Sequence, residues 1–310
     1  MNSPLERIYT KNGKIAQQIA RQLIGLPIGS RLPRIDDFVN ALRTARGTVQ
    51  GALKLLEESG AVQLDPRGHL GTFLTNKDQT LLWEIAGRNA LVGVMPLPYS
   101  RRYEGLATGL VESFQLMNIP FHIAHMRGAH RRIEAVRNRR FDFAIVSRWA
   151  AEKTCQESID LSVLQAFGEK TYVNRHGILF ADQSEDRIRP GMRVGIDPSS
   201  PDQSDLTRAE CRGLDIQWIE VNYMQLFPQL ENGEIDAAVW NLDEIPPTSK
   251  WGLGTFRSES AQSMSRLLSE ATLLTRRPGE EVWAILKELP LKPIIQTQQS
   301  VLEGKTLPHY

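Results

Sequence analysis

Several polar side chains in the first quarter of the chain have the chemistry of a DNA contact. Arg46 could donate hydrogen bonds to a guanine edge or a phosphate, and Gln50 could pair with an adenine. Small and polar residues beside them leave the backbone room to sit deep in a groove. The residues that we expect to contact DNA are Arg34, Arg46, Thr48, Gln50, Lys54, Arg67 and His69.

A second set of polar residues lies in loops that follow predicted strands. In open α/β lobes, ligands bind outside the carboxyl ends of the strands, where loops and helix N-termini converge. Backbone N–H groups after Ser100 and Ser200 could bind an anion, and Arg101 or Arg148 would add positive charge. The expected ligand is therefore a small carboxylate or phosphate-bearing metabolite. The predicted ligand-binding residues are Tyr99, Ser100, Arg101, Ser147, Arg148, Trp149, Asn174, Asp197, Ser199, Ser200 and Asn241.

Some of these features have simpler explanations, which the sequence leaves open. Ser199 and Ser200 could cap a helix, a role that is compatible with ligand binding. Trp149 could belong to the core instead of a cleft. The arginines between residues 131 and 140 are more typical of a solvated helix face than of a second DNA contact.

Motifs of catalysis and metal binding are not visible in the sequence. The chain has no GxSxG elbow, HExxH, P-loop or GxGxxG pattern. His122 and His125 lie on a predicted strand, where their spacing places them on opposite faces. We therefore expect a binding protein with no catalytic residue, metal or cofactor, and not an enzyme.

The apolar residues around the predicted DNA-contacting residues indicate two short helices and a hairpin. Apolar residues recur at helical spacing over residues 35–42 and again over residues 49–56, on either side of a short break. Each helix alone would bury too little to be stable, so the two must pack together. Residues 61–74 then predict a hairpin with a basic tip. This pattern indicates a winged helix-turn-helix.

The same region resembles the GntR-type bacterial transcription regulators. The matching residues are Gly29-Ser30-Arg31-Leu32-Pro33, the spaced apolar residues of the second helix, Gly60, and Gly71-Thr72-Phe73 in the wing. Residues 47–62 and 67–74 look most similar to the YhfZ group. The resemblance implies a dimeric, operator-binding protein whose second domain senses a small molecule.

Three positions depart from the GntR pattern. Asp36 and Gln50 stand where these regulators usually carry DNA-contacting arginines, and His69 replaces a wing glycine. The alternative hypothesis is therefore a small-molecule-binding protein whose vestigial winged helix serves dimerisation, without specific DNA binding.

From residue 91 onward the pattern is α/β. Strands predicted at 91–95, 121–125 and 143–146 alternate with helices, and a second set follows at 193–196, 216–221 and 237–240. The openings VGVMP and VGIDP match each other, which favours two lobes of similar plan. The body resembles a periplasmic-binding-protein-like sensor of class II. We predict a winged helix over residues 1–75, a linker over 76–90, and a two-lobed α/β effector-binding domain over 91–310.

Composition favours a cytoplasmic protein. The two cysteines lie far apart, the N-terminus lacks a basic-then-apolar leader, and no apolar run approaches the roughly 20 residues of a membrane helix. Residues 1–80 carry four more Lys and Arg than Asp and Glu, whereas the remainder carries three fewer. This asymmetry fits double-stranded DNA at one end. We also expect a homodimer, because helix-turn-helix proteins read two half-sites, and no membrane partner.

Overall fold

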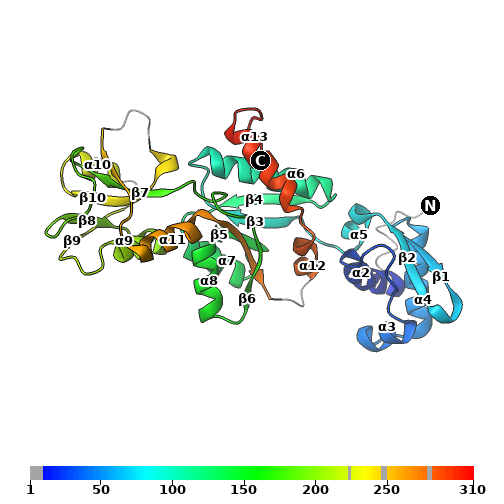
Figure 1. Cartoon of the computed structure of the whole chain (residues 1–310). Helices are drawn as coiled ribbons and strands as arrows, with labels where there is room; N and C mark the ends of the chain where they lie inside the picture. Colours follow the sequence, from blue (N-terminus) through cyan, green and yellow to red (C-terminus); the bar gives the residue numbers. More distant parts are fainter. Residues whose placement is uncertain (1–9, 223–224, 246–249, 278–280) are drawn as a thin grey trace. The chain divides into compact units, whose positions relative to one another are not determined.

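The computed structural model describes residues 10–222, 225–245, 250–277 and 281–310 (Figure 1). The chain divides into two compact units. The first contains Met1–Leu91, Phe114–His122 and Pro278–Leu289, and the second contains Val92–Ser113, Ile123–Arg277 and Pro290–Tyr310. Among the described residues, none of the helices combines the length and the apolar character that crossing a membrane requires.

Three helices form the centre of the first unit. Helix α2 (Lys11–Ile24) begins at Thr10, whose hydroxyl accepts a hydrogen bond from the Gly13 N–H at 3.0 Å. Helices α3 (Ile35–Leu42) and α4 (Arg46–Glu58) follow, separated by Arg43 in the left-handed conformation. Their buried apolar residues are those that the helical spacing predicted, and they pack against α2. The buried set comprises Ile15, Ile19, Leu23, Phe38, Val49, Ala52, Leu53 and Leu56.

The wing is a two-stranded antiparallel hairpin. Arg31 and Leu32, which precede α3, also bond to its second strand. Strands β1 (Val62–Pro66) and β2 (Thr72–Lys77) pair around the short helix η1 (Gly68–Leu70). Arg31 forms an isolated bridge with Phe73, and the Leu32 N–H donates to the Thr72 carbonyl at 2.8 Å. Gly71 has φ +93°, and an added Cβ would lie 2.6 Å from Nε of Arg31, so this turn requires glycine.

Two further helices pack against α2 in the same unit. Helix α5 (Gln79–Ile85) buries Leu82, Trp83 and Ile85, and its N-cap Asp78 accepts a hydrogen bond from the Leu81 N–H. Helix α12 (Glu281–Lys287) comes from far along the chain and also contacts α2. The segment that follows the wing is therefore a packed helix.

The first lobe of the second unit is built on a five-stranded sheet with the order β4-β3-β5-β12-β6. The sheet pairs β3 and β5 in parallel, and β12 runs antiparallel to both of its neighbours. Helices α6 and α13 lie on one side of it and α7 and α8 on the other (Figure 1). The bounds are β3 (Leu91–Met95), α6 (Arg101–Leu116), β4 (Phe121–His125), α7 (Ala129–Arg137), β5 (Phe143–Ser147), α8 (Arg148–Glu157), β6 (Leu161–Ala166), β12 (Ala271–Arg276) and α13 (Leu291–Leu302).

The second lobe repeats this plan with the order β11-β7-β10-β8-β9. Residues alternate between two cores: Ile178 and Phe180 of β7 pack on one face of the sheet, and Leu179 packs on the other. The bounds are β7 (His176–Phe180), β8 (Arg193–Ile196), α9 (Pro201–Glu210), β9 (Gln217–Glu220), α10 (Leu226–Glu231), β10 (Ala237–Asn241), η3 (Leu242–Glu244), β11 (Gly252–Gly254) and α11 (Glu259–Ser269).

The chain crosses between the lobes twice, after β6 and again after β11. The six strands predicted between residues 91 and 240 agree with their observed bounds to within one residue at each end, whereas the second wing strand extends three residues beyond its predicted end at 74. The predicted fold class, a winged helix-turn-helix followed by a two-lobed α/β body, is confirmed.

Candidate DNA interface and ligand cavity

The face of α4 turned away from α2 carries the polar residues predicted to contact DNA. Arg46, Gln50 and Lys54 are exposed, and Thr48 is half-buried. The helix has no side-chain cap at its N-terminus. Arg46, in its first turn, therefore lies beside backbone N–H groups that could reach a phosphate.

Arg46 forms an ion pair with Asp36 of α3. Nη1 of Arg46 lies 2.8 Å from Oδ1 of Asp36, and the two side chains are 63% and 69% exposed. Such an exposed pair is worth less than about 1 kcal/mol. Asp36 therefore orients Arg46 without burying it.

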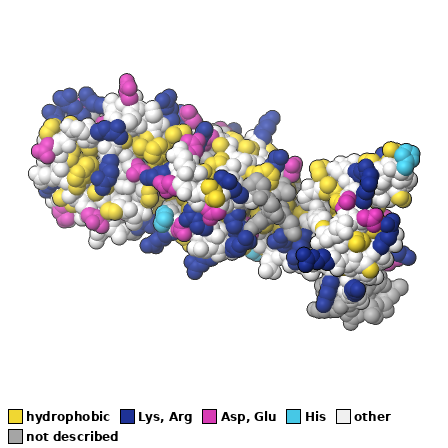
Figure 2. Space-filling view, turned by 90° about the horizontal axis from the view of Figure 1, so that it is seen from below, with side chains coloured by type: hydrophobic (Ala, Val, Ile, Leu, Met, Phe, Trp, Pro, Cys, Tyr) yellow, Lys and Arg dark blue, Asp and Glu magenta, His cyan; other side chains and the backbone are white. Residues whose placement is uncertain are grey.

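The remaining predicted DNA-contacting residues lie on the wing and before α3. Arg67 stacks over the Phe73 ring at 4.6 Å from its centroid and forms an ion pair with Asp65 at 2.7 Å. His69 is exposed in η1, and the exposed Arg34 is the N-cap residue of α3. Figure 2 shows Lys and Arg side chains interspersed with Asp and Glu on one face, instead of a continuous basic surface.

The two small residues of α4 have different surroundings. A Cβ added at Gly47 would meet open space, whereas one added at Gly51 would lie 2.5 Å from Nδ2 of Asn12 in α2. Gly51 therefore permits close approach of the two helices, whereas Gly47 leaves open space at the exposed start of α4.

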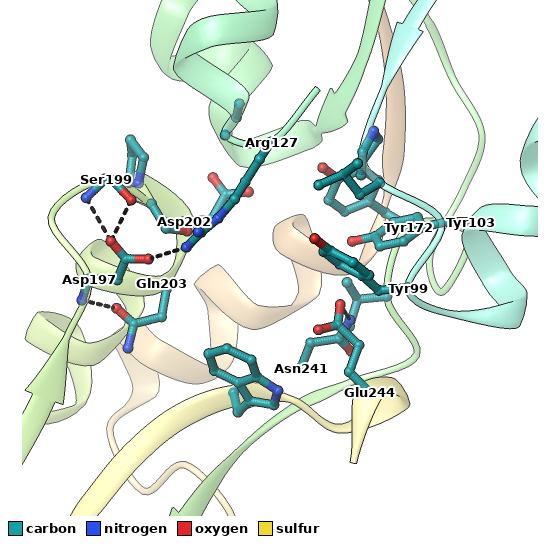
Figure 3. Close-up of a pocket in the computed structure, with 18 of the residues that line it drawn as sticks. Tyr99, Tyr103, Arg127, Tyr172, Asp197, Ser199, Asp202, Gln203, Asn241 and Glu244 are labelled. Atoms are coloured by element: carbon teal, nitrogen blue, oxygen red, sulfur yellow. Dashed lines mark hydrogen bonds and ion pairs between the residues drawn. The ribbon is translucent and has the colours of Figure 1, made fainter. Parts of the chain in front are cut away.

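A cavity of about 140 Å³ lies between the two lobes of the second unit. Figure 3 shows Asp197, Ser199, Asp202 and Gln203 on one wall, facing Tyr99, Tyr103 and Tyr172 on the other. Residues of both lobes and of the first crossing contribute. The lining comprises Pro96, Leu97, Tyr99, Tyr103, Arg127, Gly128, Ala129, Arg132, Tyr172, Val173, His176, Asp197, Ser199, Ser200, Pro201, Asp202, Gln203, Trp240, Asn241 and Glu244.

Some of the predicted ligand-binding residues converge on this cavity. They are Tyr99 of the first lobe and four residues from strand ends of the second lobe: Asp197, Ser199, Ser200 and Asn241. Their position follows the rule that ligands bind beyond the carboxyl ends of strands.

The other predicted residues are not part of the cavity lining and contact protein groups instead. Ser147 caps α8, and Ser100 lies at the start of α6, where its hydroxyl accepts from the Tyr103 N–H. The remaining four are held by protein partners: Arg101 donates to the Val301 carbonyl, Arg148 pairs with Glu152 and Glu270, Trp149 donates to Asp205, and the Asn174 N–H donates to Asp243.

Asp197 is the centre of a hydrogen-bonded network at the cavity wall. Its Oδ1 accepts from the N–H of Ser199 at 2.9 Å and from the Ser199 hydroxyl at 2.6 Å. Its Oδ2 lies 3.1 Å from Nη2 of Arg127, which comes from the first lobe. The Asp197 side chain is 5% exposed and that of Arg127 35%. This pair joins the two lobes beside the cavity.

Arg132 is a cavity residue that the sequence reasoning missed. It is 3% exposed, and it donates to the carbonyls of Ile145 and Met126 and to the hydroxyl of Tyr172. The assignment of this arginine to a solvated helix face is therefore wrong. The signal was available, because Arg132 shares the i, i+3, i+4, i+7 spacing of the apolar residues Ala129, Ile133 and Val136.

Burial dominates the titration of three further cavity residues. It raises the pKa of Tyr172 to about 12, and it lowers the pKa of His176 to about 4. Burial also raises the pKa of Asp202, while a hydrogen bond from Ser147 and the charge of Arg132 oppose that rise. Among the described residues, no cluster of His, Cys, Asp or Glu side chains has the composition of a metal site.

Two family models match successive parts of the chain. Residues 27–74 match a helix-turn-helix domain, and residues 78–310 match the YhfZ C-terminal domain. The protein YhfZ of Escherichia coli (strain K12) is 34% identical over 302 residues, which cover 97% of this chain and 98% of that protein. The HTH-type transcriptional regulator Rv1152 of Mycobacterium tuberculosis (strain ATCC 25618 / H37Rv) is 35% identical over 95 residues, 28% of this chain and 77% of that protein.

Solved structures show the same architecture for the body. The crystal structure of YhfZ from Shigella flexneri superposes with a TM-score of 0.62 at 30% identity and covers 74% of this chain and 97% of its own. The periplasmic aliphatic sulphonate binding protein SsuA from Escherichia coli has a TM-score of 0.50 at 17% identity, and the match covers 69% of this chain and 72% of that one. The second likeness shows the fold alone, a periplasmic-binding-protein-like one.

Proposed function

The chain belongs to the YhfZ family, and from this premise we propose that it is a DNA-binding transcriptional regulator whose two-lobed domain binds a small metabolite that modulates operator binding. One observation carries the proposal. A single chain combines a helix-turn-helix with an exposed polar recognition face and a cavity that two lobes share. The Mycobacterium tuberculosis relative described as a transcriptional regulator supports the DNA-binding half.

The winged helix is, in this proposal, of the GntR type. The Gly29–Pro33 motif pairs with the wing, since the Gly29 N–H donates to the Leu74 carbonyl at 2.7 Å and the Leu74 N–H donates to the Ser30 carbonyl at 2.9 Å. The two motifs that carry the resemblance are therefore parts of one small sheet. We assign residues 1–75 to DNA binding, 76–90 to a connection and 91–310 to a class II sensor.

The ligand is proposed to be a small metabolite with an anionic group. Two arginines line the cavity, and a buried guanidinium prefers the planar, bidentate geometry of a carboxylate. Arg127 is already paired with Asp197. Arg132 is therefore the better candidate for the anion, with Asn241 and Ser200 as neutral partners.

Operator binding is proposed to require a cytoplasmic homodimer. A helix-turn-helix dimer reads two half-sites about one helical turn apart, so the spacing of the two recognition helices decides affinity. A ligand that contacts both lobes would favour one lobe arrangement over another. It changes DNA binding only if its affinity differs between DNA-competent and DNA-incompetent arrangements.

One observation favours the alternative of a binding protein with a vestigial winged helix. Asp36 places a negative charge 2.8 Å from the Arg46 guanidinium, on the face that would meet phosphates. In that case the protein would bind its ligand and show no preference among DNA sequences.

Fluorescence anisotropy on the DNA upstream of the gene, against scrambled DNA of equal length, separates the two functions. We expect tighter binding to the upstream DNA at two salt concentrations and a loss of at least tenfold in the Arg46→Ala variant. Equal, weak and salt-sensitive binding to both DNAs would leave only the phosphate contribution and would favour the alternative.

A further inference from the structure

We propose that the ligand also carries a protonated amino group, as an α-amino acid does, and that Asp202 is the residue that binds this group. The inference rests on the proposed function, because it names the chemical class that the sensor cavity accepts. It adds a cationic group to the expected carboxylate-bearing metabolite, since Asp202 and Glu244 add negative charge to the cavity wall.

The first support is an unsatisfied carboxylate oxygen. Oδ1 of Asp202 is buried and has no hydrogen-bond partner among the described residues. Asp202 lies in the first turn of α9 and forms part of the cavity wall opposite the tyrosines (Figure 3). A buried acceptor without a partner is destabilising, and more so when it is charged. An ammonium group in the cavity would satisfy it.

The second support is an unsatisfied ring nitrogen on the same cavity. Nδ1 of His176, at the start of β7, is buried and has no partner among the described residues. Since burial lowers the pKa of His176 to about 4, the imidazole is neutral near pH 7 and can accept one hydrogen bond. An ammonium group has enough N–H groups to donate hydrogen bonds to both Asp202 and His176.

The third support is the balance of charge around the cavity. Arg127 and Asp197 form an ion pair, and Arg132, Asp202 and Glu244 are the other Arg, Asp and Glu residues that line the cavity. Arg132 donates to the hydroxyl of Tyr172, which lines the same cavity. A dianion would add to an existing excess of negative charge. A zwitterion places its carboxylate at Arg132 and its ammonium at Asp202.

The carboxylate end of such a ligand has a fixed partner. Arg132 uses three N–H groups on Ile145, Met126 and Tyr172, and the guanidinium has others beyond these. The cavity of about 140 Å³ is close to the volume, about 150 Å³, that holds benzene in a buried site. An amino acid with a side chain of modest size fits that space, with aromatic walls from Tyr99, Tyr103 and Trp240.

The test uses the full-length protein with matched pairs of probes. Isothermal titration calorimetry and thermal unfolding are run with each of the common L-amino acids and with its 2-hydroxy acid, such as phenylalanine with phenyllactate and leucine with 2-hydroxyisocaproate. We expect at least one amino acid to bind, and its 2-hydroxy acid to bind at least tenfold more weakly.

Two variants assign the effect to one side chain. Asp202→Asn keeps the shape and removes the charge, and we expect at least a tenfold loss of amino-acid affinity. Asp215→Asn makes the same change at an exposed aspartate of the same lobe and should bind as the wild type does. Circular dichroism of both variants checks that the fold is retained. Amino-acid affinity should also fall as the pH is lowered, because protonated Asp202 no longer attracts a cation.

Three outcomes would overturn the inference. They are equal binding of an amino acid and its 2-hydroxy acid, unchanged amino-acid affinity in Asp202→Asn, and no binding of any amino acid at millimolar concentration. Unchanged affinity in Asp202→Asn would mean that Asp202 is protonated and donates a hydrogen bond to an anionic ligand. The anisotropy experiment on upstream DNA is independent of these results, so the inference can fail while the proposed function stands.

Discussion

The chain uses an arginine–aspartate pair in two places, and the surroundings give the pairs different roles. Arg46 and Asp36 lie 2.8 Å apart on the winged helix, and Arg127 and Asp197 lie 3.1 Å apart at the sensor cavity. The distances are similar. The exposed fractions are not, since they are 63% and 69% in the first pair but 35% and 5% in the second.

Exposure decides what each pair can do. Water already solvates both partners of the first pair, so DNA phosphates can replace Asp36 at little cost. The Asp197 carboxylate is out of water and also holds the turn at Ser199, so its loss removes an ion-pair partner of Arg127 and two hydrogen bonds of that turn. A recognition surface needs replaceable contacts, whereas a cavity needs fixed ones.

The largest expected effect is on stability, from Asp197→Ala. The substitution removes the ion pair between Asp197 and Arg127 and the acceptor of the Ser199 N–H and hydroxyl, and we expect it to lower the free energy of unfolding by about 3 kcal/mol. Urea unfolding measures the change. Asp36→Ala is the matched control and should change stability by no more than about 0.5 kcal/mol. Equal losses in the two variants would break the contrast between the pairs.

The second effect is the pH dependence that His176 imposes on stability. The pKa of His176 is lowered from 6.5 to about 4, so the unfolded chain binds a proton that the folded chain excludes. The contribution of neutral His176 to the free energy of unfolding is fully present above the pKa of the unfolded chain. It is lost as the pH falls through the pKa of the folded chain. Between pH 7 and 5 the loss is about 2 kcal/mol.

Urea unfolding at the two pH values measures that loss. His176→Gln should remove most of the pH dependence, whereas His69→Gln, on the exposed wing, should leave it as in the wild type. A dependence that survives in His176→Gln would show that another group is responsible.

A smaller effect is expected at Lys54. Its ammonium is exposed and lies 3.7 Å from Glu58, so it can turn to a phosphate. Lys54→Ala should weaken binding severalfold on both upstream and scrambled DNA and reduce the salt slope by about one. Anisotropy titrations over a series of salt concentrations measure the slope. A loss confined to the upstream sequence would instead place Lys54 at a base.

The smallest effect is expected from Asp36→Asn. The substitution removes a negative charge from the DNA-facing surface while keeping its shape, and we expect affinity for both DNAs to rise about threefold. Anisotropy against the wild-type protein measures the change. A loss of affinity for upstream DNA alone would mean that Asp36 positions Arg46 for base contact.

The recognition helix could be predicted because its periodicity is local. The apolar residues of α4 repeat every turn, so Arg46, Gln50 and Lys54 follow on the opposite face without reference to the rest of the chain. The wing followed from its turn residues. The close packing at Gly51 could not be predicted, because only the fold shows that Asn12 of α2 lies against it.

The cavity was predictable only in part. Asp197, Ser199 and Asn241 follow strands, and the topological rule finds such residues. Arg127 and His176 line the cavity because two lobes close on them, and a single sequence carries no local sign of that approach. Arg132 was detectable from its place among the apolar residues of α7, and the run of arginines around it concealed this position.

Coupling between the cavity and the winged helix is the central claim, and one titration tests it most directly. Binding of the full-length protein to its upstream DNA is measured by fluorescence anisotropy, without and with each common L-amino acid at 5 mM. We expect at least one amino acid to change DNA affinity by fivefold or more, and we expect Asp202→Asn to abolish the change while Asp215→Asn retains it. An amino acid that binds the protein, as calorimetry shows, and leaves DNA affinity unchanged would show that the cavity and the winged helix are not coupled.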